Sequence, residues 1–137
     1  MWLLAVLSMV STTPQSGGMI VGGTPFGPKQ SLTCTWFTNF ENSRFLQCWS
    51  SQGKPLLAGD GASVECTGRL CQDLDADARK VARWRRPEPP WGRFKVQVVG
   101  RISLQPHKKQ YVGDGTDTVL IEELVRVWAY KPPRGLR

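Results

Sequence analysis

Four cysteines carry the clearest chemical signal in this chain of 137 residues. A structural zinc site usually takes its ligands from close pairs such as Cys-x2-Cys, and the spacing here does not match that pattern. The single histidine, His107, supplies no further ligand pair. An even number of cysteines in a small domain instead predicts two disulfides, and three connectivities are possible among Cys34, Cys48, Cys66 and Cys71.

The stretch between the first two cysteines predicts a β-hairpin. Threonine and aromatic residues favour strands on both sides, and the polar centre over residues 39–43 favours a turn. Folding about Glu41 predicts these opposed pairs: Cys34 with Cys48, Trp36 with Leu46, and Phe37 with Phe45. Opposed cysteines lie close enough for a bond, so we favour Cys34–Cys48, with Cys66–Cys71 closing a tight loop.

No set of residues indicates an enzyme. Residues 20–23 read Ile-Val-Gly-Gly, like the mature N-terminus of a trypsin-like protease, but a catalytic triad needs a histidine, an aspartate and a nucleophilic serine. The only histidine is His107, and no Gly-Asp-Ser-Gly-Gly sequence is present. Asp114 and Asp117 offer fewer oxygen ligands than a calcium loop uses. We therefore expect a protein without catalytic residues, metal ions or other cofactors.

The basic charge of the chain points to anionic partners. The formal net charge of +7 attracts nucleic acid, anionic lipid or acidic glycans, although a solvated basic surface is the simpler explanation. Four residues of the expected strands combine cations with an aromatic ring and form a candidate ligand-binding face: Arg44, Trp49, Lys95 and Arg101. The interpretation that the sequence favours is that Trp49 packs against the protein and the cations solvate the sheet.

Alternating apolar residues and turn signals divide the chain into several strands and one helix. The helix is expected over residues 72–84, where Leu74, Ala78 and Val81 form one apolar stripe. Aspartates crowd its start and arginines its end, an order that complements the helix dipole. Strands are expected over residues 32–38, 44–50, 92–105 and 118–130, and a short strand pair over residues 56–58 and 62–66 takes the third place in the order.

The last two strands are long and amphipathic. Apolar and polar residues alternate over residues 92–105, which predicts one buried and one wet face. Gly100 lies on the apolar face, at a position that suits a bend or a bulge. In the final strand the charged Glu123 intrudes into the apolar phase that contains Ile121 and Val125, and a bulge near Glu122–Glu123 would relieve this misfit.

The order of these elements predicts the fold class. We expect a mainly β protein, a small five-stranded OB-like barrel in the order β-β-β-α-β-β with one helix. A lipocalin-like barrel would need more strands, and a ferredoxin-like fold would need a second helix. The barrel domain is expected over residues 31–130, followed by a basic tail over residues 131–137.

The first residues have features of an export signal. Residues 1–10 form an apolar run that is too short to span a bilayer as a helix and suits the apolar region of a signal peptide. No basic residue precedes the run, and no Ala-x-Ala site follows it. We predict a signal peptide over residues 1–17, a flexible lead-in over residues 18–30, and a periplasmic or secreted location.

Three segments together resemble small exported bacterial proteins of uncharacterised function. They read W-F-T-N-F-E-N-S-R-F-x-x-C, F-K-V-Q-V-V-G-R-I-S and G-D-G-T-D-T-V-L-I-E-E-L, within residues 33–128. The shared positions of the hairpin and of a Val-x-Gly-Arg strand are Glu41, Ser43, Phe45, Cys48, Gly100 and Arg101. Residues 112–115 replace a Gly-His-Gly segment frequent in that group, so no role of a histidine is carried over. The resemblance implies an OB-like architecture and an extracytoplasmic location, and no chemistry.

Taken together, these features predict an exported, disulfide-stabilised binding or interaction module that is not an enzyme. The sequence does not encode the identity of its ligand. An envelope protein or an acidic polysaccharide fits an exported basic protein, whereas nucleic acid fits it poorly. The alternative is a cytosolic OB-fold nucleic-acid-binding protein whose cysteines are reduced.

Overall fold

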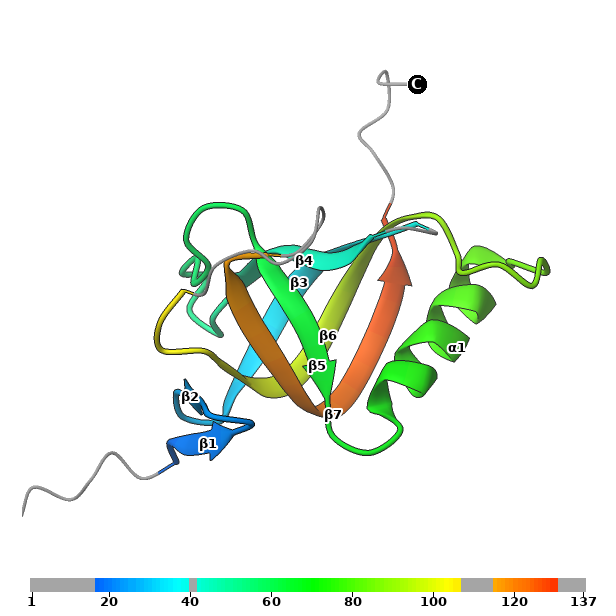
Figure 1. Cartoon of the computed structure of the whole chain (residues 1–137). Coiled ribbons are helices and arrows are strands. Elements are labelled where there is room, and N and C mark those ends of the chain that lie inside the picture. The colour runs from blue at the N-terminus through cyan, green and yellow to red at the C-terminus, as the bar shows by residue number, and fades with distance from the viewer. Residues whose placement is uncertain (1–16, 40–41, 107–114, 131–137) are drawn as a thin grey trace, which may run out of the picture.

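The computed structural model describes residues 17–39, 42–106 and 115–130. Two short strands precede a barrel, and one helix lies between its third and fourth strands by position along the chain (Figure 1). The elements in chain order are β1 Met19–Val21, β2 Thr24–Phe26, β3 Gln30–Thr38, β4 Ser43–Trp49, β5 Ala62–Cys66, α1 Leu70–Ala82, β6 Gly92–Ile102 and β7 Asp117–Ala129.

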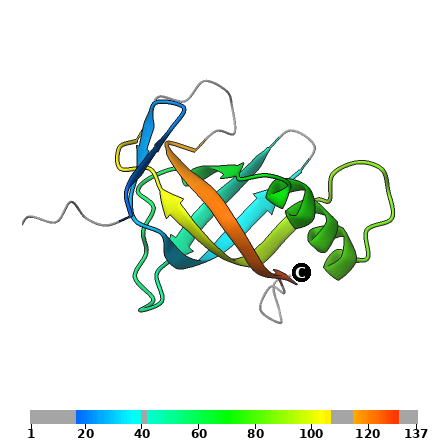
Figure 2. The same ribbon diagram turned by 90° about the horizontal axis from the view of Figure 1, so that it is seen from below.

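The five strands from β3 to β7 close into a barrel in the order β3-β4-β5-β7-β6 (Figures 1 and 2). β6 pairs back onto β3, so the ring leaves no open sheet edge between its first and last strands. β5 and β7 pair in parallel, and the other pairs of the ring are antiparallel. The predicted mainly β, five-stranded OB-like barrel with one helix is confirmed.

Alternation along the strands separates the barrel core from the outer surface. β3 buries Leu32, Cys34 and Trp36, while Thr33 and Thr35 between them stay partly exposed. Each large apolar side chain that is fully buried contributes about 1.5–3 kcal/mol to folding. The other strands supply the same core with Phe45, Phe94, Val96, Val98, Val119 and Ile121.

Helix α1 packs against β7 and buries Leu74 and Ala78. It starts at Leu70 and not at residue 72, and the chain leaves the helix at Arg83, whose φ of 53° is left-handed. Val81, which was expected to complete the apolar stripe, is 39% exposed. The prediction that Val81 packs against the barrel is therefore wrong. The helix contacts the barrel through the two turns that carry Leu74 and Ala78, and Val81 lies beyond them.

Both expected disulfides are present. Cys34 and Cys48 are opposed across β3 and β4, with Cα atoms 4.0 Å apart, and both are fully buried. Cys66 and Cys71 join the end of β5 to the first turn of α1, with Cα atoms 5.5 Å apart. All four cysteines are therefore bonded, and each disulfide ties two neighbouring elements of the barrel together.

Beyond the disulfide, the predicted register of the first hairpin is wrong. A bulge leaves Leu46 without an opposed residue, so Trp36 pairs with Phe45 and Phe37 with Arg44. Without the bulge, strict alternation from Cys48 would turn Arg44 into the core and Phe45 out to solvent. The extra residue reverses that phase, because burying the aromatic ring is favourable and burying an unpaired charge is costly.

The bulge predicted near Glu122–Glu123 is confirmed. Gly100 pairs with Ile121 and the preceding residue of β6 pairs with Glu123, so Glu122 is the extra residue of β7. A Cβ atom at Gly100 would collide with the carbonyl oxygen of Leu120. The close approach of β6 and β7 at this bulge therefore requires glycine, as its position on the apolar face indicated.

A second irregularity in β7 lies outside the prediction. Leu124 pairs with Val98 and Arg126 with Gln97, which leaves Val125 as an extra residue that is 50% exposed. The assignment of Val125 to the apolar phase is therefore wrong, and Leu124 packs against the core in its place.

The expected strand over residues 56–58 does not form. Leu57 is buried, and its backbone N–H and C=O are both hydrogen-bonded by the side-chain amide of Gln47. This side chain takes the place of a strand partner, and only Ala62–Cys66 joins the barrel there.

Residues 18–30 contain secondary structure where a flexible lead-in was expected. β1 and β2 pair as a short hairpin, and Phe26 at its end is 1% exposed. Phe26 forms a bridge with Ser103, and the N–H of Gly27 donates to the carbonyl oxygen of Ile102. The burial of one aromatic ring thus anchors the segment to one end of the barrel, although its glycines and prolines suggested a linker.

Candidate ligand-binding face

A continuous outer surface runs across β4, β3, β6 and β7. Directly opposed residues of antiparallel strands point to the same side of a sheet, so the register arranges the outward residues in rows. Three rows define what we call the sheet face. Each row runs from β4 across the sheet towards β7. The first row is Arg44, Phe37, Arg93 and Tyr130. The second row is Gln47, Thr35, Lys95 and Trp128, and the third row is Trp49, Thr33, Gln97 and Arg126.

The sheet face combines cations with aromatic rings and contains no carboxylate. Its cations are Arg44, Arg93, Lys95 and Arg126, and its aromatic residues are Phe37, Trp49, Trp128 and Tyr130. Cationic and aromatic side chains on the strands of small barrels are typical of surfaces that hold anionic oligomers. The composition of the sheet face therefore marks it as the first candidate for a binding surface.

Two cations of the sheet face lie over the ring of Trp128. The Nζ atom of Lys95 is 5.4 Å from the centre of its indole ring, and the guanidinium carbon of Arg126 is 4.6 Å away. Exposed contacts of this kind contribute about 0.5–1 kcal/mol each and hold the cations above the ring. Within the described residues, none of the four cations of the sheet face forms an ion pair. Their charge is therefore available to an anion.

Arg44 has hydrogen-bonding capacity that the described part of the chain leaves unused. Its Nε atom is buried and has no hydrogen-bond partner among the described residues. A buried donor without an acceptor costs about 1–3 kcal/mol. Such a donor is uncommon in a native protein, and here it occurs on the sheet face, beside Phe37.

A depression of about 470 Å³ lies on the sheet face, and we call it the sheet pocket. Two aromatic residues and four serine or threonine residues contribute to it, together with one cation. Its lining consists of Thr33, Thr35, Trp49, Ser50, Ser51, Gly53, Lys95 and Tyr130. This volume lies within the usual range for sites that bind small molecules or single units of a polymer.

The structure brings three of the four predicted site residues onto one surface. Trp49 and Lys95 line the sheet pocket together, and Arg44 belongs to the first row of the same sheet face. Arg101 lies apart, beyond the three rows, where it pairs with Leu120 of β7. The sequence could not separate Arg101 from Lys95, because both residues alternate in phase with outward positions of the same strand.

Arg101 has a structural partner. Its Nε atom donates to Glu122 at 2.7 Å, and its Nη1 atom donates to the carbonyl oxygen of Gly27 at 3.3 Å. Lys29 approaches the other oxygen of the same carboxylate at 3.6 Å. Chiefly because of the Arg101 hydrogen bond, the pKa of Glu122 is lowered below its ordinary value of 4.5. This network joins the N-terminal hairpin to the bulge of β7.

Sequence reasoning missed the contribution of β7 to the sheet face. Arg126, Trp128 and Tyr130 alternate along the end of the chain and face outward with the rows of β6. The signal was present, since cationic and aromatic residues recur there at every second position. It was missed although the expected apolar phase through Val125 and Val127 already places these three residues on the opposite face of the strand.

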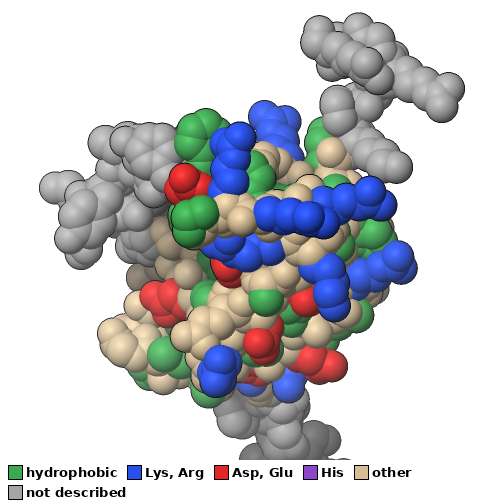
Figure 3. Space-filling model, turned by 90° about the vertical axis from the view of Figure 1, so that its right-hand side faces the viewer, with side chains coloured by type: hydrophobic (Ala, Val, Ile, Leu, Met, Phe, Trp, Pro, Cys, Tyr) green, Lys and Arg blue, Asp and Glu red, His purple; other side chains and the backbone are tan. Residues whose placement is uncertain are grey.

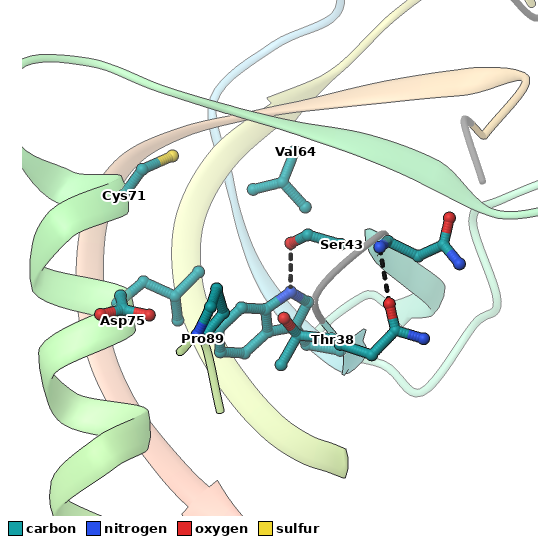
Figure 4. Close-up of a pocket in the computed structure, with 10 residues that line it drawn as sticks. Thr38, Ser43, Val64, Cys71, Asp75 and Pro89 are labelled. Atoms are coloured by element: carbon teal, nitrogen blue, oxygen red, sulfur yellow. Dashed lines mark hydrogen bonds between the residues drawn. The ribbon is translucent and has the colours of Figure 1, made fainter. Parts of the chain in front are cut away.

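A second depression, of about 310 Å³, has different chemistry (Figure 4). It lies between α1 and the β3–β4 hairpin, where Trp36 donates from Nε1 to the hydroxyl of Ser43 at 2.9 Å. Trp36 itself is only 4% exposed. Among the described residues of its lining, the one charged residue is Asp75, whose carboxylate already pairs with Arg79 at 2.7 Å. This described lining therefore offers no cation to an anionic ligand.

A second group of cations lies at the C-terminal end of α1, and we call it the helix-end cluster: Lys80, Arg83, Arg85 and Arg86. Figure 3 shows lysine and arginine side chains gathered on one part of this side of the molecule, with most acidic side chains on another. Arg79 fixes the loop after the helix by donating to the carbonyl oxygens of Arg86 and Pro87. The helix-end cluster provides a natural control for tests of the sheet face.

No protein-family model, curated protein or solved structure matches this chain significantly. In the part of the chain that the structure describes, no helix is long and apolar enough to cross a membrane. The case for a function therefore rests on the chemistry and geometry of the sheet face.

Proposed function

We propose that the protein is an exported, non-enzymatic binding module whose sheet face holds an acidic polysaccharide. The observation that carries this proposal is the set of four cations on the sheet face, which lack carboxylate partners among the described residues and alternate with aromatic rings. The three rows span four strands, so several units of a polymer can contact the face at once.

The disulfides support the choice of an exported partner. All four cysteines are bonded, and disulfides persist in oxidising compartments outside the cytosol. The apolar run at the start of the chain supports the same location. In such a compartment, acidic glycans are abundant polyanions and nucleic acids are not the usual partners.

The alternative is a cytosolic binder of single-stranded nucleic acid. The same cations and aromatic rings would suit a phosphate backbone and stacked bases. The two disulfides argue against this alternative, because cytosolic reductants keep most thiols reduced. Single-stranded DNA therefore serves as a competitor in the tests of the proposal.

Removing two cations of the sheet face tests the proposal. We expect K95Q/R126Q to bind immobilised polygalacturonate and heparin at least about tenfold more weakly than the unaltered protein, because each lost cation contributes roughly 1 kcal/mol to anion binding. Affinity measured by biolayer interferometry at fixed ionic strength provides the readout, with dextran as the neutral polymer.

The matched control removes the same charge elsewhere. R83Q/R85Q alters the helix-end cluster and lowers the net charge equally, so we expect it to change affinity by less than about twofold. An equal loss in both variants would mean that overall charge governs binding and would contradict the proposed face. Binding of single-stranded DNA alone would favour the nucleic-acid alternative.

A further inference from the structure

We propose that the sheet pocket accepts one hexuronate ring, so that the polysaccharide is carboxylated and not sulfated. This inference rests on the proposed function. A pyranose ring with a carboxylate presents apolar C–H faces, several hydroxyls and a single negative charge. The sheet pocket presents a complement to each of these three features: aromatic side chains, hydroxyl-bearing side chains and one cation.

The aromatic part of the sheet pocket comes from Trp49 and Tyr130. Trp49 is half-buried beside Thr33, whereas Tyr130 directly follows β7 and is 46% exposed. Both side chains combine a large apolar surface with a polar atom, so they can pack against the C–H face of a sugar ring while hydrogen-bonding at its edge. The stacking surface is therefore part of the pocket lining itself.

The hydroxyl groups come from Thr33, Thr35, Ser50 and Ser51. Within the described residues, the hydroxyls of Thr33 and Thr35 have no hydrogen-bond partner. The Oγ atom of Ser50 accepts from the N–H groups of Gln52 and Lys54, which leaves its own proton to donate. A hydroxyl both donates and accepts, so this lining matches the vicinal hydroxyls of a sugar.

Among the described residues, Lys95 is the only cation that lines the sheet pocket. An ammonium group acts as a compact point charge, so Lys95 supplies one positive charge, which balances one carboxylate but not several sulfate groups. In the part of the chain that the structure describes, no Asn, Gln, Asp or Glu side chain lines the pocket, so it lacks the groups that read the edges of adenine and cytosine. One carboxylated ring fits this charge pattern better than a nucleotide or a multiply sulfated sugar.

The sheet pocket is largely preformed. Its floor belongs to the paired strands β3 and β6, which are fixed by the barrel. Its rim is a tight turn in which the N–H of Ser50 donates to Lys54 at 2.9 Å and the N–H of Gly53 donates to Ser50 at 2.9 Å. A rigid site loses little conformational entropy on binding, which favours recognition of a defined ring shape.

Titration calorimetry with short oligosaccharides tests this inference. We expect oligogalacturonate to bind at least about tenfold more tightly than the same oligosaccharide after reduction of its carboxyl groups, and more tightly than a heparin oligosaccharide of equal length. We expect Trp49→Ala to weaken oligogalacturonate binding by about tenfold or more, and Trp49→Phe to restore most of it. Trp91→Ala removes an exposed tryptophan outside the sheet pocket and serves as the matched control.

The outcomes separate this inference from the proposed function. Binding of heparin but not of oligogalacturonate, still dependent on Lys95 and Arg126, would overturn the uronate site and leave an acidic polysaccharide as the ligand. Equal losses in Trp49→Ala and Trp91→Ala would also overturn the site. Failure of every acidic polysaccharide to bind would overturn both. Near-ultraviolet circular dichroism of each variant confirms that the barrel is folded before binding is compared.

Discussion

At the scale of single residues, the partner of each cation separates structural roles from candidate binding roles. Arg101 and Lys29 both pair with the carboxylate of Glu122, whereas Lys95 and Arg126 lie over the ring of Trp128. The sequence identified Lys95 and Arg101 as equivalent basic positions on one strand. It could not identify their partners, because the position of Glu122 depends on a bulge in a strand that is distant along the chain.

The Glu122 network gives a prediction for stability and pH. We expect Glu122→Gln to lower the free energy of unfolding at neutral pH by about 1.5–3 kcal/mol, since it removes a charged hydrogen bond to Arg101. The pKa of Glu122 is lowered in the folded state, so its contribution is present above about pH 4.5 and is lost as the pH falls through the lower folded value. Urea unfolding at several pH values measures this.

The control for that experiment is the neighbouring carboxylate. Glu123 is exposed and pairs in register with Val99, so we expect Glu123→Gln to change stability by less than about 0.5 kcal/mol. If the difference between Glu122→Gln and the unaltered protein stayed constant down to pH 2, the ion pair would not be its cause.

At the scale of the elements, residue spacing predicts the regular segments and fails where a bulge changes the phase. The alternation of β6, the helix with Leu74 and Ala78, and both disulfides could be predicted from spacing alone. The bulges at Leu46 and Val125 could not, because each is favoured by the burial of a ring or side chain in the closed barrel. Those two bulges also decide which cations reach the sheet face.

The disulfide between β3 and β4 gives a prediction at this scale. We expect Cys34→Ser to destabilise the protein by about 2–4 kcal/mol under oxidising conditions, because it opens the loop to Cys48 in the unfolded chain and leaves a polar group in the core. Thermal unfolding followed by circular dichroism measures the shift. If the reductant-treated protein and the variant both melted at the midpoint of the unaltered protein, the hairpin disulfide would have no stabilising role.

At the scale of the whole molecule, two basic regions divide the surface. The sheet face carries cations among aromatic rings on the barrel, and the helix-end cluster carries cations where they complement the helix dipole. The net charge alone could not distinguish them, since both contribute to the same sum. The three-dimensional arrangement favours the sheet face, because it adds the sheet pocket and the outward aromatic rings of β4 and β7.

The most direct test of the central claim maps the bound ligand onto the barrel. Oligogalacturonate is titrated into isotopically labelled protein, and amide and tryptophan side-chain chemical shifts are followed by NMR. We predict that the shifts concentrate on the sheet face, with the indole N–H signals of Trp49 and Trp128 among the largest. Shifts confined to the helix-end cluster or to the depression beside Trp36 would contradict the account.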